Sequence, residues 1–249
     1  MEIISHRGNG FDYPENSLPA FSKALKNGFS IELDIHLSKD GVPFIIHDKY
    51  IDDILNGTGD VASFDSKQLK KFCYKKDKSL KLVEFKEVIE LFESIKDPSA
   101  NIFVHIQDIN EKGVIENILR LIQNSKHNER FYLFAVDEMS FILIEEIKKN
   151  YKKIKVGLHL PENSKYFDEV NFKKADFIWV DEMNGKWFSE EMVDLAHCLK
   201  KKIYAISPEL MKDSAYYNNY KERARDINEF GFDGICTDFP LRFERLLKG

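Results

Sequence analysis

The sequence predicts an α/β fold and, within that class, a (β/α)8 TIM barrel. Short runs of β-branched and aromatic residues alternate along the chain with longer stretches of helical periodicity. Strands that alternate with helices pair in parallel through right-handed crossovers. A length of 249 residues suits eight such units in one barrel better than an open doubly wound sheet.

Eight apolar runs are predicted to be the barrel strands. They cover residues 2–5, 30–35, 101–106, 131–136, 153–160, 176–181, 202–207 and 233–238. Amphipathic segments separate them, and the clearest of these segments are residues 17–28, 84–95, 113–124 and 227–231. The order of strands and helices is therefore the order that a barrel requires.

One connection is too long for an ordinary loop. It covers residues 37 to about 83, and it contains the turn sequences "KDG" and "NGTGD" and a lysine-rich half. We expect this connection to form a small inserted subdomain after the second strand, within a single domain that spans residues 1–249.

Charge and composition narrow the classes of function. The chain has 37 basic and 42 acidic residues and a net charge of -5, so we expect no nucleic-acid partner. The N-terminus lacks the basic and apolar regions of a signal peptide, and no run of 18 apolar residues occurs. We therefore expect a cytoplasmic protein without a membrane span, while the oligomeric state is not predicted.

The second predicted strand indicates a metal site. Glu32 and Asp34 are two residues apart, so their side chains project to the same side of the strand. Their repulsion is tolerable on a solvated edge or beside a cation, and the apolar residues around them argue against a solvated strand. Further polar residues lie near the ends of other predicted strands, where barrels of this kind place their chemistry: His6, His105, Gln107, His159, Asp181 and Asp238.

The order of several motifs resembles the glycerophosphodiester phosphodiesterase family. The N-terminal part contains "HRG", "PENS", "ELD", "DG" and "HD" in the order and spacing of that family. The segment "ILNGTGDVASFDSKQLKKF" resembles its insertion, and "GFDGICTDFP" is similar to its closing motif. The resemblance spans nearly the whole chain. It implies a TIM-barrel enzyme that hydrolyses a glycerophosphodiester, or glycerol phosphate linked to another alcohol, to glycerol phosphate and an alcohol.

The resemblance also implies roles for residues of the first motifs. His6 and His47 are the implied acid and base, and histidine suits both proton transfers near neutral pH. Arg7 is implied to bind the substrate phosphate, which its forked guanidinium fits. Glu15 is expected to hold either an imidazole or Arg7 in place.

The implied metal site departs from the family pattern. Glu32 and Asp34 match ligands of a divalent cation (Mg²⁺, Mn²⁺ or Ca²⁺), but His105 and Gln107 stand where the family has a third acidic ligand and a lysine. A neutral His105 can ligate through nitrogen, which shifts the preference toward Mn²⁺ or another transition metal. Gln107 can donate a hydrogen bond to phosphate. Lys49 either replaces the missing lysine or is a solvated loop residue.

Other positions receive no role or a different one. We expect His36, His127 and His197 to be surface or helix residues without a function. The seventh predicted strand ends in residues 206–209, "ISPE", where the family often has W-T-x-N. The pocket for the alcohol is therefore expected to differ from that of the family.

Three hypotheses remain from the sequence. The leading one is a metal-dependent phosphodiesterase. The second is a related lyase that stops at a cyclic phosphate, as the venom phospholipases D that resemble this family do. The third is a phosphodiester-binding barrel without turnover, which the missing acid and lysine suggest. The retained histidines and carboxylates favour the first hypothesis.

Overall fold

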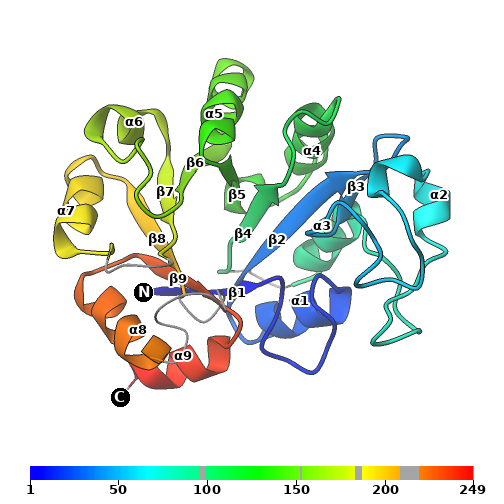
Figure 1. Cartoon of the computed structure of the whole chain (residues 1–249), viewed down its shortest axis with the longest axis horizontal. Coiled ribbons are helices and arrows are strands. Elements are labelled where there is room, and N and C mark those ends of the chain that lie inside the picture. The colour runs from blue at the N-terminus through cyan, green and yellow to red at the C-terminus, as the bar shows by residue number, and fades with distance from the viewer. Residues whose placement is uncertain (96–98, 152, 183–186, 208–218, 249) are drawn as a thin grey trace. The chain divides into compact units, whose positions relative to one another are not determined.

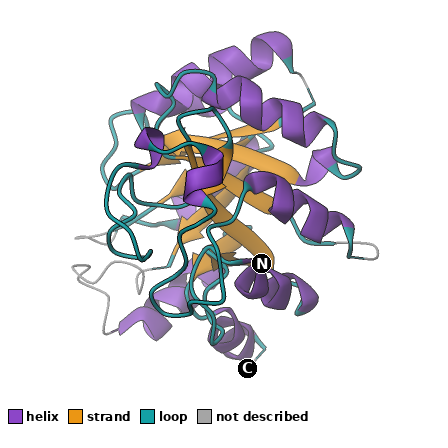
Figure 2. Cartoon of the chain, turned by 90° about the vertical axis from the view of Figure 1, so that its right-hand side faces the viewer, coloured by secondary structure: helices purple, strands orange, loops and turns teal. Residues whose placement is uncertain are grey.

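The computed structural model describes residues 1–95, 99–151, 153–182, 187–207 and 219–248. Its contacts divide the chain into two compact halves, Arg7–Phe131 and Met1–His6 with Tyr132–Gly249. Each half contains parallel strands with helices beside them (Figures 1 and 2). Pro208 and Glu209, on which the expected difference in the alcohol pocket rests, lie outside the described residues.

The strands of Arg7–Phe131 position the predicted metal ligands. Strand β2 (Ser30–Leu37) pairs in parallel with β4 (Ile102–Ile106) and antiparallel with β3 (Pro43–Ile45). All eight residues of β2 are buried, which confirms that its carboxylates do not lie on a solvated edge. The register aligns Asp34 with His105 on the neighbouring strand.

Helices of this half bury one apolar face each. Residues three and four apart lie on one face of a helix, so α1 (Leu18–Lys26) buries Ala20, Phe21 and Ala24 together. Helix α3 (Phe85–Glu93) follows the same pattern. The remaining helical elements are α4 (Val114–Gln123), the short α2 (Ser66–Leu69) and the 3-10 turns η1 (Val61–Ser63) and η2 (Asn128–Arg130).

The long connection after β2 has a hydrophobic cluster of its own. It contains β3, η1 and α2, and its cluster consists of Phe44, Ile46, Ile51, Leu55, Val61, Leu69, Tyr74 and Leu82. The Tyr74 hydroxyl donates a hydrogen bond of 2.7 Å to the Asn16 carbonyl. The assignment of this connection as an inserted subdomain of one domain stays a prediction.

The other half is a succession of parallel strands. Strand β1 (Glu2–His6) pairs with β9 (Gly234–Thr237), and the ladder continues through β8 (Lys202–Ile206), β7 (Phe177–Val180), β6 (Lys155–Leu160) and β5 (Phe131–Val136). Its helices are α5 (Glu138–Asn150), α6 (Glu169–Lys174), α7 (Glu190–Cys198), α8 (Tyr220–Glu229) and α9 (Pro240–Leu247).

The eight predicted strands are confirmed as β1, β2 and β4 to β9, each within two residues at either end. Strand β3 lies outside these eight barrel strands, and α8 begins seven residues before the segment predicted from periodicity. Among the helices of the described ranges, none has the length and apolarity needed to cross a membrane.

Candidate metal and phosphodiester site

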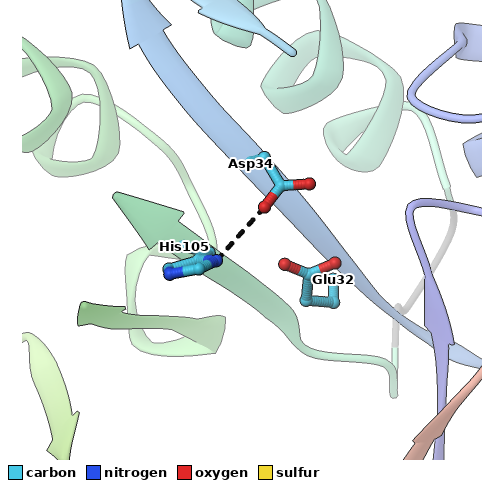
Figure 3. A group of neighbouring side chains, drawn as sticks. All are labelled: Glu32, Asp34 and His105. Carbon is cyan, nitrogen blue, oxygen red and sulfur yellow. Dashed lines mark hydrogen bonds and ion pairs between the residues drawn. The ribbon is translucent and has the colours of Figure 1, made fainter. Parts of the chain in front are cut away.

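Two carboxylates and an imidazole gather at β2 and β4. Glu32 and Asp34 project from one face of β2 toward His105 on β4 (Figure 3). The two carboxylates are only 3% and 1% exposed. One ligand atom from each of the three residues lies within 4.8 Å of the other two. The alternation of side chains along β2 and the parallel register of β4 together produce this cluster.

Asp34 is the most heavily contacted member of this cluster. Its Oδ1 accepts a hydrogen bond of 2.5 Å from Gln107 Nε2 and lies 3.2 Å from His105 Nδ1. Gln107 Nε2 is also 2.9 Å from His105 Nδ1. Asp34 Oδ2 forms an ion pair of 3.0 Å with Arg7 Nε, yet it accepts no hydrogen bond from the residues that the structure describes. A buried acceptor of this kind remains available to a cation.

The two carboxylates differ in protonation. Burial raises the pKa of Glu32 well above its ordinary value, and the charge of Asp34 raises it further. Burial acts in the same sense on Asp34, but the hydrogen bond to His105 and the charge of Arg7 outweigh it and hold the pKa of Asp34 below its ordinary value. Without a cation, Glu32 therefore holds its proton to a higher pH than Asp34 does.

This donor set fits a divalent cation. When Glu15, Glu32 and Asp34 are all ionised, the charge of Arg7 leaves two of the three negative charges uncompensated. Carboxylate oxygens with one imidazole nitrogen suit Mn²⁺ and other borderline ions, and two carboxylates also suit Mg²⁺ or Ca²⁺. Three observations therefore support a divalent cation at this position. They are three ligand atoms close together, a buried Asp34 oxygen that accepts no hydrogen bond from the described residues, and uncompensated negative charge when the carboxylates are ionised.

The "HRG" turn directs Arg7 into this cluster. Arg7 and Gly8 both have left-handed backbones, with φ of 52° and 74°. A Cβ atom on Gly8 would lie 3.0 Å from Ala20 Cβ, so only glycine lets the turn pack this closely on α1. The backbone amide of Arg7 donates a hydrogen bond of 3.4 Å to Glu32 Oε2. The Nη1 atom of the Arg7 side chain donates a hydrogen bond of 3.1 Å to Glu15 Oε1. Of the two partners expected for Glu15, the structure pairs it with Arg7.

Both predicted acid/base histidines pair with an aspartate through Nδ1. His47 follows β3, and its Nδ1 lies 2.7 Å from Asp48 Oδ1. In the other half of the chain, His6 Nδ1 lies 2.9 Å from Asp238 Oδ1. A carboxylate at Nδ1 favours the tautomer whose proton is on Nδ1, which leaves Nε2 to exchange a proton. The roles of Asp48 and Asp238 were not predicted, although "HD" and "CTD" contain the signal.

The surface assignment of His36 is wrong. His36 is 6% exposed, and its Nδ1 lies 2.7 Å from Glu111 Oε1. Burial lowers the pKa of His36, but the hydrogen bond and charge of Glu111 outweigh it and raise the pKa.

Lys49 has an exposed side chain and forms an ion pair of 3.3 Å with Asp60, which favours the solvated-loop interpretation.

The second half contains a further pair near its strand ends. His159 on β6 is buried, and its Nε2 lies 3.3 Å from Asp181 Oδ2, which follows β7. The sequence predicts both as polar residues near strand ends, without a role.

Known proteins resemble the chain in sequence and fold. The sequence pattern of the glycerophosphoryl diester phosphodiesterase family matches residues 6–242. A glycerophosphodiester phosphodiesterase of Caldanaerobacter subterraneus is 32% identical over 165 residues, which are 63% of this chain and 65% of that protein, just under two thirds of its length. One from Bacillus altitudinis is 24% identical over 250 residues, which are 97% of this chain and 96% of that protein.

Solved structures show the fold. A phosphodiesterase of Oleispira antarctica, solved with the product sn-glycerol-3-phosphate, matches with a TM-score of 0.81 at 18% identity, covering 100% of this chain and 97% of that one. A putative glycerophosphodiester phosphodiesterase of Galdieria sulphuraria also gives a TM-score of 0.81 at 18% identity, covering 100% of this chain and 98% of that one. The predicted TIM-barrel fold is confirmed.

Fold and site define a TIM-barrel protein with a cluster of carboxylates and a histidine on two neighbouring strands, β2 and β4. The match over residues 6–242 then identifies the family: the chain belongs to the glycerophosphoryl diester phosphodiesterases, a family of phosphoric diester hydrolases. The resemblance inferred from the motifs is confirmed.

Proposed function

We propose that the chain is a metal-dependent phosphodiesterase that hydrolyses a glycerophosphodiester to glycerol phosphate and an alcohol. The observation that carries the proposal is the meeting of two buried carboxylates, an imidazole and a guanidinium around Asp34. Such a site neutralises the charge of a phosphodiester, which otherwise resists nucleophilic attack. Family membership and the product bound to the Oleispira antarctica relative support this substrate class.

The binding groups of the proposed site lie in residues 7–131. Glu32, Asp34 and His105 hold the divalent cation, which when bound supplies positive charge to the phosphate oxygens. Arg7 binds the phosphate, and Glu15 holds its guanidinium. The side-chain amide of Gln107 donates a hydrogen bond to Asp34 and lies close to His105. The predicted hydrogen bond from Gln107 to phosphate would use this same amide group.

His6 and His47 transfer the protons. One histidine takes the proton of the neighbouring glycerol hydroxyl, whose oxygen attacks phosphorus, and the other protonates the departing alcohol oxygen. The product of this step is a cyclic phosphate. Water then opens the ring while the two histidines exchange roles, as microscopic reversibility requires. Asp48 and Asp238 hold the Nδ1 protons, so that Nε2 is the exchanging atom in both residues.

Phosphorus NMR tests this proposal. Purified protein is incubated with glycerophosphodiesters that carry different alcohols, with Mg²⁺, Mn²⁺ or Ca²⁺ and with a chelator as the control. We expect a glycerol phosphate signal that requires a divalent ion. A cyclic phosphate that persists in water would favour the lyase, and substrate binding without turnover under every ion would favour a binding barrel.

A further inference from the structure

His36 and Glu111 connect the metal-site strand to the segment that carries His47. His36 is two residues beyond Asp34, so the alternation along β2 places both side chains on the same face. Its Nδ1 lies 2.7 Å from Glu111 Oε1, and its Nε2 lies 3.2 Å from the main-chain carbonyl oxygen of His47. Glu111 Oε2 accepts a hydrogen bond of 2.6 Å from the amide of Leu37. Glu111 is therefore attached to β2 at two adjacent residues.

Among the residues that the structure describes, few others restrain His47. It lies after the end of β3 at Ile45, and its imidazole is 39% exposed beside the still more exposed Asp48. The preceding residue is held by a hydrogen bond of 3.0 Å from the Ile46 amide to the Asp34 carbonyl. The carbonyl of His47 is held by a buried side chain, His36. The direction in which the peptide of His47 faces therefore depends on that contact.

We infer that His36 and Glu111 are positioning residues for His47. They hold the peptide that carries the imidazole at a constant distance from the strand that carries Glu32 and Asp34. Neither residue is assigned a contact with substrate. The inference rests on the proposed function, in which His47 transfers a proton to or from a phosphodiester bound beside those carboxylates. Misplacement of a reacting group by about 1 Å can cost on the order of 10²-fold in rate, so a contact outside the reacting atoms can control turnover.

Two substitutions at position 36 separate the two hydrogen bonds of the ring. An asparagine amide reaches about as far as Nδ1, so His36→Asn keeps a donor toward Glu111 and loses the one toward His47. A glutamine amide reaches about as far as Nε2, so His36→Gln keeps the donor toward His47. We expect His36→Asn to lower kcat on the order of 10-fold to 10²-fold with KM little changed. The fall in kcat should be far smaller in His36→Gln.

A second pair tests the same contact from the other side. In Glu111→Gln the amide can donate to His36 Nδ1 and accept from the Leu37 amide, whereas Glu111→Leu can do neither. We expect Glu111→Gln to retain more turnover than Glu111→Leu. This pair replaces the first one if His36→Asn does not fold. His197→Asn is the matched control, because it alters an exposed histidine that lies 3.0 Å from Asp233.

The decisive measurement is a double-mutant cycle with His47→Ala. If His36 acts through the imidazole of His47, then His36→Asn should cause no further loss of kcat once that imidazole is gone. An equal loss in both backgrounds, equal activities of His36→Asn and His36→Gln, or a parallel fall in Mn²⁺ affinity would each overturn the inference while leaving the proposed function intact. A wild-type protein that turns over no glycerophosphodiester would refute the proposed function, and the inference with it.

Discussion

Replacing one buried carboxylate should stabilise the metal-free protein and reduce the stabilisation that a metal ion provides. Glu32 and Asp34 offer oxygen atoms within 4.8 Å of each other, and two unit charges at that distance repel by about 3.5 kcal/mol at an effective dielectric constant of about 20. Arg7 and proton uptake by Glu32 offset part of this repulsion. We therefore expect Glu32→Gln to stabilise the metal-free protein by on the order of 1–3 kcal/mol.

The assay is thermal unfolding with a chelator and with divalent ions. For a chain of this size, 1 kcal/mol corresponds to about 2–4 °C in Tm. In the presence of chelator, Glu32→Gln should have a higher Tm than wild type. With an ion at about 100 times its Kd, wild type should gain about 2.7 kcal/mol, and Glu32→Gln should gain much less. Glu90→Gln, which alters an exposed carboxylate on α3, is the matched control.

The pH dependence provides a second check of the same variant. The pKa of Glu32 is raised in the folded protein, so the folded state holds more protons than the unfolded state above the ordinary glutamate value. The stability of the metal-free protein should then fall as pH rises from about 4.3 to the raised pKa, and Glu32→Gln should remove this fall. The reasoning would be refuted if Glu32→Gln were less stable than wild type in chelator. It would also be refuted if metal raised the stability of the variant by as much as it raises that of wild type.

Two further predictions concern the histidines of the site. His6→Ala and His47→Ala should each lower turnover on the order of 10²-fold to 10⁴-fold. Loss of the proton donor should lower turnover of a substrate with an alkyl leaving group far more than that of one with an aryl leaving group. Equal losses on both substrates for both variants would contradict these roles. His105→Glu should shift the metal preference from Mn²⁺ toward Mg²⁺ or Ca²⁺, measured both as activity with each ion and as binding by titration calorimetry. An unchanged metal preference in His105→Ala would show that His105 is not a ligand.

The strands were predictable because their signal is local. Each barrel strand is a short, largely apolar run, as in residues 131–136, and such runs need no knowledge of their partners. Strand β3 has three residues and pairs antiparallel with β2, so it lies outside the alternation of strands and helices that marks the other eight. Helix α8 is mostly polar along its length, with "KERARDINE" after Tyr220, so the apolar signal marked only its end.

Without the family resemblance, which also pointed to His105, the site was predictable only where one strand or one motif contains it. Side-chain alternation places Glu32 and Asp34 together, and the same alternation places His36 on their buried face rather than at the surface. The contact with Glu111 was not predictable, because it joins residues 75 positions apart through a loop after β4. The alignment of Asp34 with His105 likewise depends on strand register, which a single sequence does not specify.

The histidine on β4 changes the charge of the site as well as its ligand chemistry. With an acid at position 105, as in the family pattern, Glu32 and Asp34 would face a third negative charge opposed by Arg7. With neutral His105, that charge is absent, and the imidazole instead lies 3.2 Å from Asp34 Oδ1, where it lowers the pKa of this carboxyl. The metal-free site is therefore less repulsive, and a cation gains less electrostatic energy on binding. Because an imidazole nitrogen favours borderline ions over hard ones, the loss should be greater for Ca²⁺ and Mg²⁺ than for Mn²⁺. We therefore expect His105 to make the metal-free site less repulsive and to favour Mn²⁺ over Ca²⁺ and Mg²⁺.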